Sequence, residues 1–171
     1  THGGSIAYGD PAAELPAFAV AANAEIILMG LNGIRTIQAS DFYHGLFETD
    51  IQNDEILTSI KYPILKDNQK ILFDEIYRRH GDYAMAGVVA NIEILNNKIN
   101  NLKLVFFATG TKPEVALKTS ELIIKDGYDY NNVKNMIKTE LDFESDLNSN
   151  AEMKLHLATI LTNKVLKLME A

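Results

Sequence analysis

The spacing of apolar residues divides the chain into segments with strand periodicity and segments with helix periodicity. Apolar side chains repeat every second residue in Val88, Ala90, Ile92 and Ile94, as one buried sheet face requires. This pattern predicts strands over residues 25–28, 34–37, 54–63, 72–79, 85–95 and 98–108. The three- to four-residue pattern predicts helices over residues 11–23, 113–127, 133–141 and 151–168, and a short helical turn over residues 40–47.

Turn and capping residues set the expected boundaries. Asn32-Gly33 is a strong signal for a two-residue hairpin, and Asn96-Asn97 favours a tight turn because Asn tolerates left-handed geometry. Asp10 and Pro11 are suited to the N-cap and first position of a helix. The segments 111–114 and 149–152 both match the capping-box pattern, so each predicts a helix start.

The order of these elements predicts an α+β protein with two domains. A polar, lysine-bearing stretch at residues 64–69 separates two different patterns. We expect a first domain over residues 1–63 and a second over residues 64–171. The second domain is predicted to be a three-stranded antiparallel sheet with three helices packed on one face.

Composition narrows the function classes. The chain has 171 residues and a net charge of −7, from 16 basic and 23 acidic residues, which argues against a nucleic-acid or anionic-membrane surface. No apolar run approaches the about 20 residues of a membrane span. The absence of cysteine excludes disulfides, and it places any iron–sulfur cluster on a partner chain. We expect a cytoplasmic protein.

The chemistry that stands out lies in the first sixteen residues. Gly3 and Gly4 are flanked by hydroxyl residues, and successive N–H groups in a glycine turn can form a concavity for an anion such as a pyrophosphate. Glu14 falls in the first turn of the predicted helix, where its carboxylate could accept hydrogen bonds from ribose hydroxyls. The alternative is a tight turn that feeds a helix, with Glu14 complementing the helix dipole.

Two well-separated motifs resemble one protein family. The string Thr-x-Gly-Gly-Ser-x-Ala-x-x-Asp-Pro-Ala-Ala-Glu-Leu-Pro at residues 1–16 is similar to the second flavin-binding motif of the FAD (medium) subunit of molybdenum hydroxylases, the carbon monoxide dehydrogenase and xanthine dehydrogenase family. Arg78-Arg79-x-Gly81-Asp82-Tyr83-Ala84 resembles a second family motif. A third and weaker match covers residues 145–153, where Asn150 and Met153 depart from the usual serine and tyrosine.

The resemblance implies a set of cofactor contacts. Thr1, Gly3, Gly4 and Ser5 would hold the FAD pyrophosphate, and Glu14 would bind ribose or nearby hydroxyls. Leu57 would pack near the cofactor and Tyr83 would lie near the flavin ring. Plain core is the alternative for Leu57, and an ordinary half-buried tyrosine is the alternative for Tyr83. Arg78 is a candidate for a phosphate or for partner carboxylates, or else a solvated strand end.

The resemblance also implies the fold and the function. It predicts the second subdomain of a PCMH-type FAD-binding domain, followed by the C-terminal domain of the flavoprotein subunit. Such a subunit takes electrons from [2Fe–2S] clusters on a small subunit, which receive them from molybdopterin on a large subunit, and passes them to an acceptor. We therefore expect an oxidoreductase subunit in a hetero-oligomer, such as a dimer of heterotrimers, with no catalytic residue and no metal ligand of its own.

Two further expectations concern what residues 1–171 do without the rest of such a subunit. The family's first flavin subdomain precedes the motif at residues 1–16, so the chain looks like the later part of a subunit, and we expect it to bind FAD weakly and to be inactive alone. The alternative from a different class is a module that docks on redox partners without retaining FAD. A weaker alternative is a distant flavin-fold relative that reduces cell-wall precursors.

Overall fold

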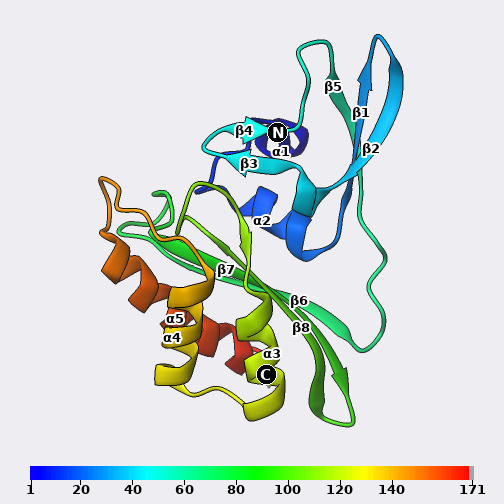
Figure 1. Cartoon of the computed structure of the whole chain (residues 1–171). Helices are drawn as coiled ribbons and strands as arrows, with labels where there is room; N and C mark the ends of the chain where they lie inside the picture. The colour runs from blue at the N-terminus through cyan, green and yellow to red at the C-terminus, as the bar shows by residue number, and fades with distance from the viewer. Residues whose placement is uncertain (170–171) are drawn as a thin grey trace.

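The computed structural model describes residues 1–169 and contains five helices and nine strands in that range (Figure 1). The helices are α1 His2–Tyr8, α2 Glu14–Ala21, α3 Leu117–Asp126, α4 Tyr130–Glu140 and α5 Ala151–Lys167, with a 3₁₀ turn at Ala39–Asp41. The strands are β1 Glu25–Gly30, β2 Gly33–Gln38, β3 Tyr43–Gly45, β4 Glu48–Thr49, β5 Ile56–Lys61, β6 Gln69–Ile76, β7 Ala86–Leu95, β8 Lys98–Phe107 and β9 Glu114–Val115. The predicted α+β class is confirmed.

Three antiparallel sheets organise these strands. One has the order β2-β1-β5, one is the short pair β3-β4, and the third has the order β6-β7-β8-β9. Figure 1 shows β6, β7 and β8 crossing the middle of the molecule, with α3, α4 and α5 on one side and α2 on the other. The largest sheet, called the central sheet below, is therefore covered on both faces. It has four strands where the sequence predicted three.

The two faces of the central sheet belong to two separate apolar clusters. The side facing α3, α4 and α5, called the helical side, is apolar along both long strands. Its strand residues are Ala86, Val88, Ala90, Ile92, Leu102, Leu104 and Phe106. The other face, called the α2 side, packs Val89, Val105 and Phe107 against small residues of α2 such as Ala17 and Ala21. The alternation of side chains along a strand separates these clusters.

Polar side chains of the central sheet also reach the end of α2. Asn91 donates through Nδ2 to the carbonyl of Ala21 at 2.8 Å, and Lys103 Nζ donates to the carbonyl of Val20 at 2.6 Å and to Asn23 Oδ1 at 2.8 Å. The last carbonyls of a helix have no partner within the helix, so these donors satisfy them. Burial lowers the pKa of Lys103. The sheet thus fixes α2 by its C-terminal end.

The two hairpins have the predicted strands. Asn96 and Asn97 adopt φ of 52° and 58°, so both take the left-handed conformation that favoured Asn at this turn. In the other hairpin β1 and β2 pair with Gly30 opposite Gly33, so the two-residue loop is Leu31-Asn32 and the predicted loop Asn32-Gly33 is wrong by one residue. Gly33 follows the loop with φ of 113°, which only glycine adopts readily.

The predicted helix over residues 11–23 is wrong at its start. The described chain has two short helices here, α1 before Gly9 and α2 from Glu14. Asp10 does not cap a helix, because its Oδ1 accepts from the N–H of Ala12 at 2.9 Å and holds the turn between α1 and α2. Gly9 has φ of 66° and ends α1 in the left-handed conformation. Ala13 precedes α2 and contributes no side-chain cap.

The short helical turn predicted over residues 40–47 ends at Asp41. Beyond it, β3 and β4 form a tight hairpin with Tyr43 opposite Thr49. Phe47 lies in the turn with φ of 54°. The apolar residues that suggested a helix are instead divided between the buried side of this hairpin, which carries Tyr43, and its exposed tip.

Both predicted capping boxes are displaced. Glu114 lies in β9, opposite Phe106 of β8, and not in the first turn of a helix. The first turn of α3 is bound instead by Glu140 of α4, whose Oε2 accepts from the N–H of Thr119 at 2.9 Å. The cap of α5 is Asn150, which accepts from the N–H of Met153 at 2.8 Å, one residue after the predicted Ser149.

Candidate functional site

The first turn of α1 presents free main-chain donors. Thr1 is its N-cap, and Thr1 Oγ1 accepts from the N–H of Gly4 at 3.2 Å. The N–H groups of His2 and Gly3 precede the first intrahelical hydrogen bond and point out of the helix start, where the dipole favours an anion. The glycine pair was predicted in a loop, which is wrong. A threonine cap outweighs the low helix propensity of two glycines.

The surroundings of the two glycines explain Gly4 and locate Gly3. A β-carbon on Gly4 would stand 2.7 Å from Thr1 Oγ1, which would displace the capping hydroxyl. A β-carbon on Gly3 would touch Leu57 Cδ2 at 3.9 Å, so Leu57 of β5 lies directly beside the glycine pair. The structure therefore brings Thr1, Gly3, Gly4 and Leu57 together, as the predicted contacts require.

A groove opens at the other end of α1 and along the turn that follows it. It has a volume of about 380 Å³, within the usual range of about 300–1,000 Å³ for ligand pockets. Two segments supply its walls, one at the start of the chain and one in the loop after β6. The lining residues are Ser5, Tyr8, Asp10, Ala12, Ala13, Glu14, Gly81, Asp82 and Tyr83. Ser5, Glu14 and Tyr83, three predicted site residues, therefore share one groove.

Arg78 does not join this groove. It lines a neighbouring hollow of about 330 Å³, where its Nη2 donates to the carbonyl of Asn148 at 2.7 Å. The two hollows share Gly81, Asp82 and Tyr83. Arg78 is thus separated from Glu14 by the loop that carries Tyr83, and it ties that loop to the segment before α5.

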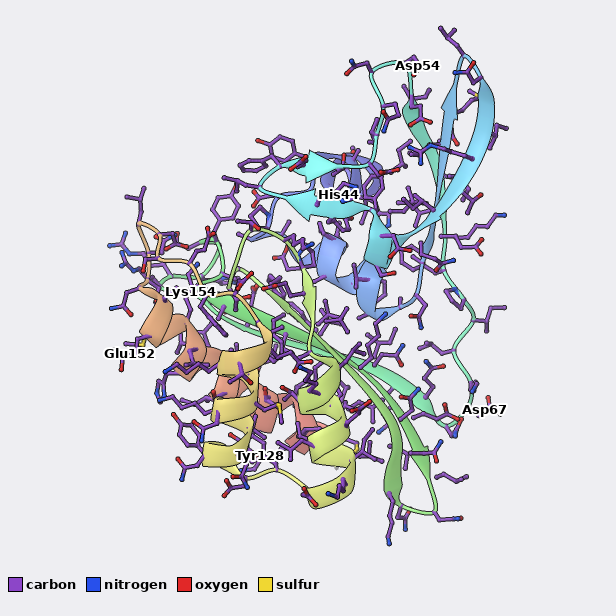
Figure 2. All side chains as sticks on the ribbon, in the orientation of Figure 1. His44, Asp54, Asp67, Tyr128, Glu152 and Lys154 are labelled. Carbon is purple, nitrogen blue, oxygen red and sulfur yellow. The ribbon has the colours of Figure 1, made fainter. Side chains whose placement is uncertain are left out.

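The segment before α5 is held by an ion pair between a buried lysine and an exposed aspartate. Lys154 Nζ lies 2.7 Å from Asp146 Oδ2, and the Lys154 side chain is only 4% exposed. Figure 2 shows Lys154 where α5 meets the rest of the molecule and Glu152 on the outer side of the same helix. Burial alone would raise the pKa of Asp146, but hydrogen bonds from Lys154 and two backbone N–H groups outweigh burial and lower that pKa. This pair fixes the loop whose carbonyl Arg78 contacts.

A second carboxyl group stands close to Glu14. Glu75 of β6 has its Oε2 buried without a hydrogen-bond partner among the described residues. Burial raises the pKa of Glu75, and the nearby carboxylates of Glu14 and Asp74 raise it further. The sequence did not single out Glu75, because its proximity to Glu14 arises only when β6 meets the start of α2.

The strand that carries Leu57 is positioned by Arg35 of β2. Arg35 Nε lies 2.7 Å from Glu55 Oε1, and Arg35 Nη1 lies 2.6 Å from Asp50 Oδ2. These contacts lower the pKa of both carboxyls, because the guanidinium favours their ionised forms. The network joins β2 to the chain entering β5, two residues before Leu57.

The described residues offer a donor set suited to a dinucleotide. The helix start carries two free N–H groups and a hydroxyl, which suit a diphosphate. The groove carries carboxylates and tyrosines, which suit hydroxyls and flat rings. Within residues 1–169 no group of three or more His, Cys, Asp or Glu is placed to hold a metal ion. None of the helices in that range has the length and apolar character needed to cross a bilayer.

Comparison with known proteins gives matches over both halves. Residues 1–65 match the family described as the FAD binding domain in molybdopterin dehydrogenase, and residues 71–169 match the CO dehydrogenase flavoprotein C-terminal domain. The glyceraldehyde dehydrogenase medium chain of Sulfolobus acidocaldarius is 32% identical over 170 residues, which cover 98% of this chain and 60% of the relative. The caffeine dehydrogenase subunit beta of a Pseudomonas species is 27% identical, over 97% of this chain and 58% of the relative.

Solved structures agree with these matches. Quinoline 2-oxidoreductase from Pseudomonas putida superimposes with a TM-score of 0.88 at 25% identity, over 98% of this chain and 59% of the other. Carbon monoxide dehydrogenase from Hydrogenophaga pseudoflava superimposes with a TM-score of 0.90 at 22% identity, over the same shares of the two chains, which shows a shared fold. The chain spans about 60% of the length of these proteins.

The two family matches define the class of protein, a FAD-binding domain followed by a flavoprotein C-terminal domain. The helix start and the groove occur on the same sheet-and-helix framework that the solved structures share. The chain belongs to the FAD-binding medium-chain family of molybdenum hydroxylases, which includes carbon monoxide dehydrogenase medium chains. The family resemblance of the sequence is thereby confirmed. The division at residues 63 and 64 and the individual cofactor contacts stay predictions.

Proposed function

We propose that this chain binds FAD and carries electrons within a molybdenum-containing oxidoreductase. The observation that carries the proposal is the coincidence of the family match over residues 1–65 with a groove that unites Ser5, Glu14 and Tyr83. Flavin bound there supplies redox chemistry, which accepts and releases electrons one or two at a time. The residues of the chain supply binding and orientation.

Each predicted contact has a role in this proposal. The N–H groups at the start of α1, with the hydroxyls of Thr1 and Ser5, hold the diphosphate. Gly3 and Gly4 allow its close approach because they carry no side chain, and a β-carbon on Gly4 would also displace the hydroxyl of Thr1. Glu14 accepts hydrogen bonds from sugar hydroxyls, while Leu57 and Tyr83 exclude water from the flavin. Arg78 acts indirectly, by fixing the Tyr83 loop through Asn148.

The relatives suggest the surrounding assembly. They include medium chains of glyceraldehyde dehydrogenase and carbon monoxide dehydrogenase, and subunit beta of caffeine dehydrogenase. In this proposal the chain docks on an iron–sulfur small subunit and a molybdopterin large subunit, receives electrons from [2Fe–2S] clusters and delivers them to an external acceptor, in the cytoplasm. The substrate binds a different subunit, and the chain is inactive alone.

A titration with FAD tests the proposal. We expect saturable binding by the protein, detected as a change in flavin absorbance and fluorescence. Glu14→Gln keeps the side-chain shape but removes a charged acceptor, so binding should weaken about tenfold. The matched control is Glu152→Gln on the outer side of α5, which should leave the affinity unchanged. Equal FAD affinities for Glu14→Gln and Glu152→Gln would show that Glu14 does not contact FAD.

The alternative function is docking on redox partners without a retained cofactor. One observation favours it, the exposed apolar tip of the β2-β1-β5 sheet, where Leu31, Ile34 and Ile56 are 91%, 70% and 61% exposed. Apolar surface of this kind is typical of interaction sites. A colourless protein that shows no flavin binding but still captures its partner chains would establish this alternative and refute the first proposal.

A further inference from the structure

Tyr8 at the end of α1 has no role among the predicted flavin contacts, although it lines the same groove as Tyr83. The two tyrosines are 62% and 68% exposed, and they come from segments that lie far apart in the sequence. Single exposed aromatic residues are common at protein surfaces. Two that line one groove of ligand size form a surface suited to a flat ring.

The ring of Tyr8 is held in place by the β3-β4 hairpin. Its centroid lies 4.9 Å from that of Phe47, with the two planes tilted by 44°. Phe47 adopts φ of 54°, a conformation that costs a bulky residue energy and occurs where surrounding contacts maintain it. Gly9, which follows Tyr8, packs closely on the same hairpin, because a β-carbon there would stand 2.8 Å from Thr49 Cγ2. Tyr8 is therefore braced from the side of the hairpin.

The polar residues that line the groove favour hydroxyl and amino groups of a ligand over its phosphates. Asp10, Glu14 and Asp82 give the groove three carboxyl groups, and Ser5 lines it from the middle of α1, between the helix start and Tyr8. Carboxylates accept hydrogen bonds from hydroxyl and amino groups and repel phosphates. The phosphates of a dinucleotide are better placed at the start of α1, where the free N–H groups lie. The groove is suited to a heteroaromatic ring with the hydroxyl-bearing chain attached to it.

We propose that Tyr8, braced by Phe47, is a ring-stacking residue of this groove that works together with Tyr83 on the ring-and-hydroxyl part of the flavin nucleotide. The inference rests on the proposed FAD binding and deepens it, because it assigns a contact that the family motifs left open. Isoalloxazine with its ribityl chain and adenine with its ribose share this chemistry, and the experiment distinguishes them.

The test compares Tyr8→Ala, Tyr8→Phe and the control Tyr77→Ala. Tyr77 is 42% exposed and stacks on His80, but it is not among the groove residues. Loss of an aromatic partner should weaken FAD binding about three- to tenfold in Tyr8→Ala and reduce the quenching of flavin fluorescence. Tyr8→Phe and Tyr77→Ala should bind as the unchanged protein does. Titrations with FMN and with ADP show which ring Tyr8 contacts, since only that ligand should be weakened.

A second variant, Phe47→Gly, tests the same contact in case Tyr8→Ala fails to fold. Phe47→Gly accepts the left-handed conformation without strain and removes only the brace. It should weaken FAD binding less than Tyr8→Ala does, and the double variant should be no weaker than Tyr8→Ala alone, because the two residues act as a unit. Wild-type FAD binding with an unchanged affinity in Tyr8→Ala would overturn this inference alone. Absence of FAD binding by the wild type would overturn the proposed function itself.

Discussion

Phe106 and Phe107 are neighbours in β8 and both are fully buried, yet they lie in different parts of the molecule. Phe106 faces α3, α4 and α5 among branched and aromatic apolar residues. Phe107 faces α2, where its ring lies over Gly87 and stacks on Phe73 at a centroid distance of 5.9 Å. One strand therefore contributes to two cores of different character.

The two sides of the central sheet differ in the side chains that pack against them. The helical side is filled by large apolar side chains from five elements, so it behaves as a rigid support. On the α2 side, alanines of α2 pack against Val89, Val105 and Phe107 of the sheet, and hydrogen bonds from Asn91 and Lys103 fix the end of that helix. The groove with Glu14 borders this second side. We infer that the helical side determines stability and the α2 side determines the geometry of the groove.

The largest effect should come from the helical side. Phe106→Ala leaves a cavity among buried residues and should lower the free energy of unfolding by about 3–5 kcal/mol. Urea unfolding measures the loss, and FAD titration at low temperature should show an affinity within about twofold of the wild type, since one such change at a distance couples weakly. A strong loss of FAD affinity in a folded Phe106→Ala protein would contradict the division between the two sides.

A smaller loss of stability is expected from Gly87→Ala, which overpacks the α2 side instead of leaving a cavity. The added β-carbon would overlap the ring of Phe107, so the ring must move toward α2. Overpacking of this kind costs about 1–3 kcal/mol. Here the affinity for FAD should fall together with stability, because α2 carries Glu14 at its start. Phe107→Leu in the same protein makes room for the β-carbon, and it should recover part of both losses.

The smallest effect is a pH dependence at Glu114, an ionisable exception on the helical side. Glu114 is opposite Phe106, and burial raises the pKa of its carboxyl from 4.5 to about 7. Between these values the unfolded chain binds fewer protons than the folded one, so stability should fall as the pH rises from about 4.5 to 7. Allowing for partial exposure, the change is about 1–2 kcal/mol.

Glu114→Gln provides the control for this titration. Glutamine has the same shape but no ionisable proton, so its unfolding free energy should lack the component that falls across this pH range. Urea midpoints measured at several pH values for both proteins give the difference. Parallel curves for Glu114 and Gln at position 114 would show that the carboxyl does not titrate in this range.

Local signals explain what the sequence predicted well. The turn at Asn96-Asn97 depends on two adjacent residues that tolerate left-handed geometry, and both strands beside it alternate clearly. The end of α3 at Gly127 is also local, since φ of 77° suits glycine. Such features need no knowledge of distant contacts, and the sequence therefore located them.

Distant contacts explain what the sequence missed. Glu114 has the pattern of a capping residue, but pairing with Phe106 of β8 places it in a strand. For Arg78 the sequence left a phosphate, partner carboxylates or a solvated strand end open, and it did not indicate the carbonyl of Asn148, 70 residues later, that accepts a hydrogen bond from Arg78. The groove was also only partly predicted, because contacts between distant segments form it. Family motifs pointed to Ser5, Glu14 and Tyr83, whereas Tyr8 gained its position only from the hairpin that carries Phe47.

The carboxylate of Glu140 has a consequence for how the helical side opens. Its Oε2 accepts from the N–H of Thr119 at 2.9 Å and from Thr119 Oγ1 at 2.8 Å, so the last residue of α4 closes the first turn of α3. Neither helix can fray at that junction without releasing the other. Amide hydrogen exchange in the first turn of α3 and the last turn of α4 should therefore proceed through one shared opening event, with matching protection factors.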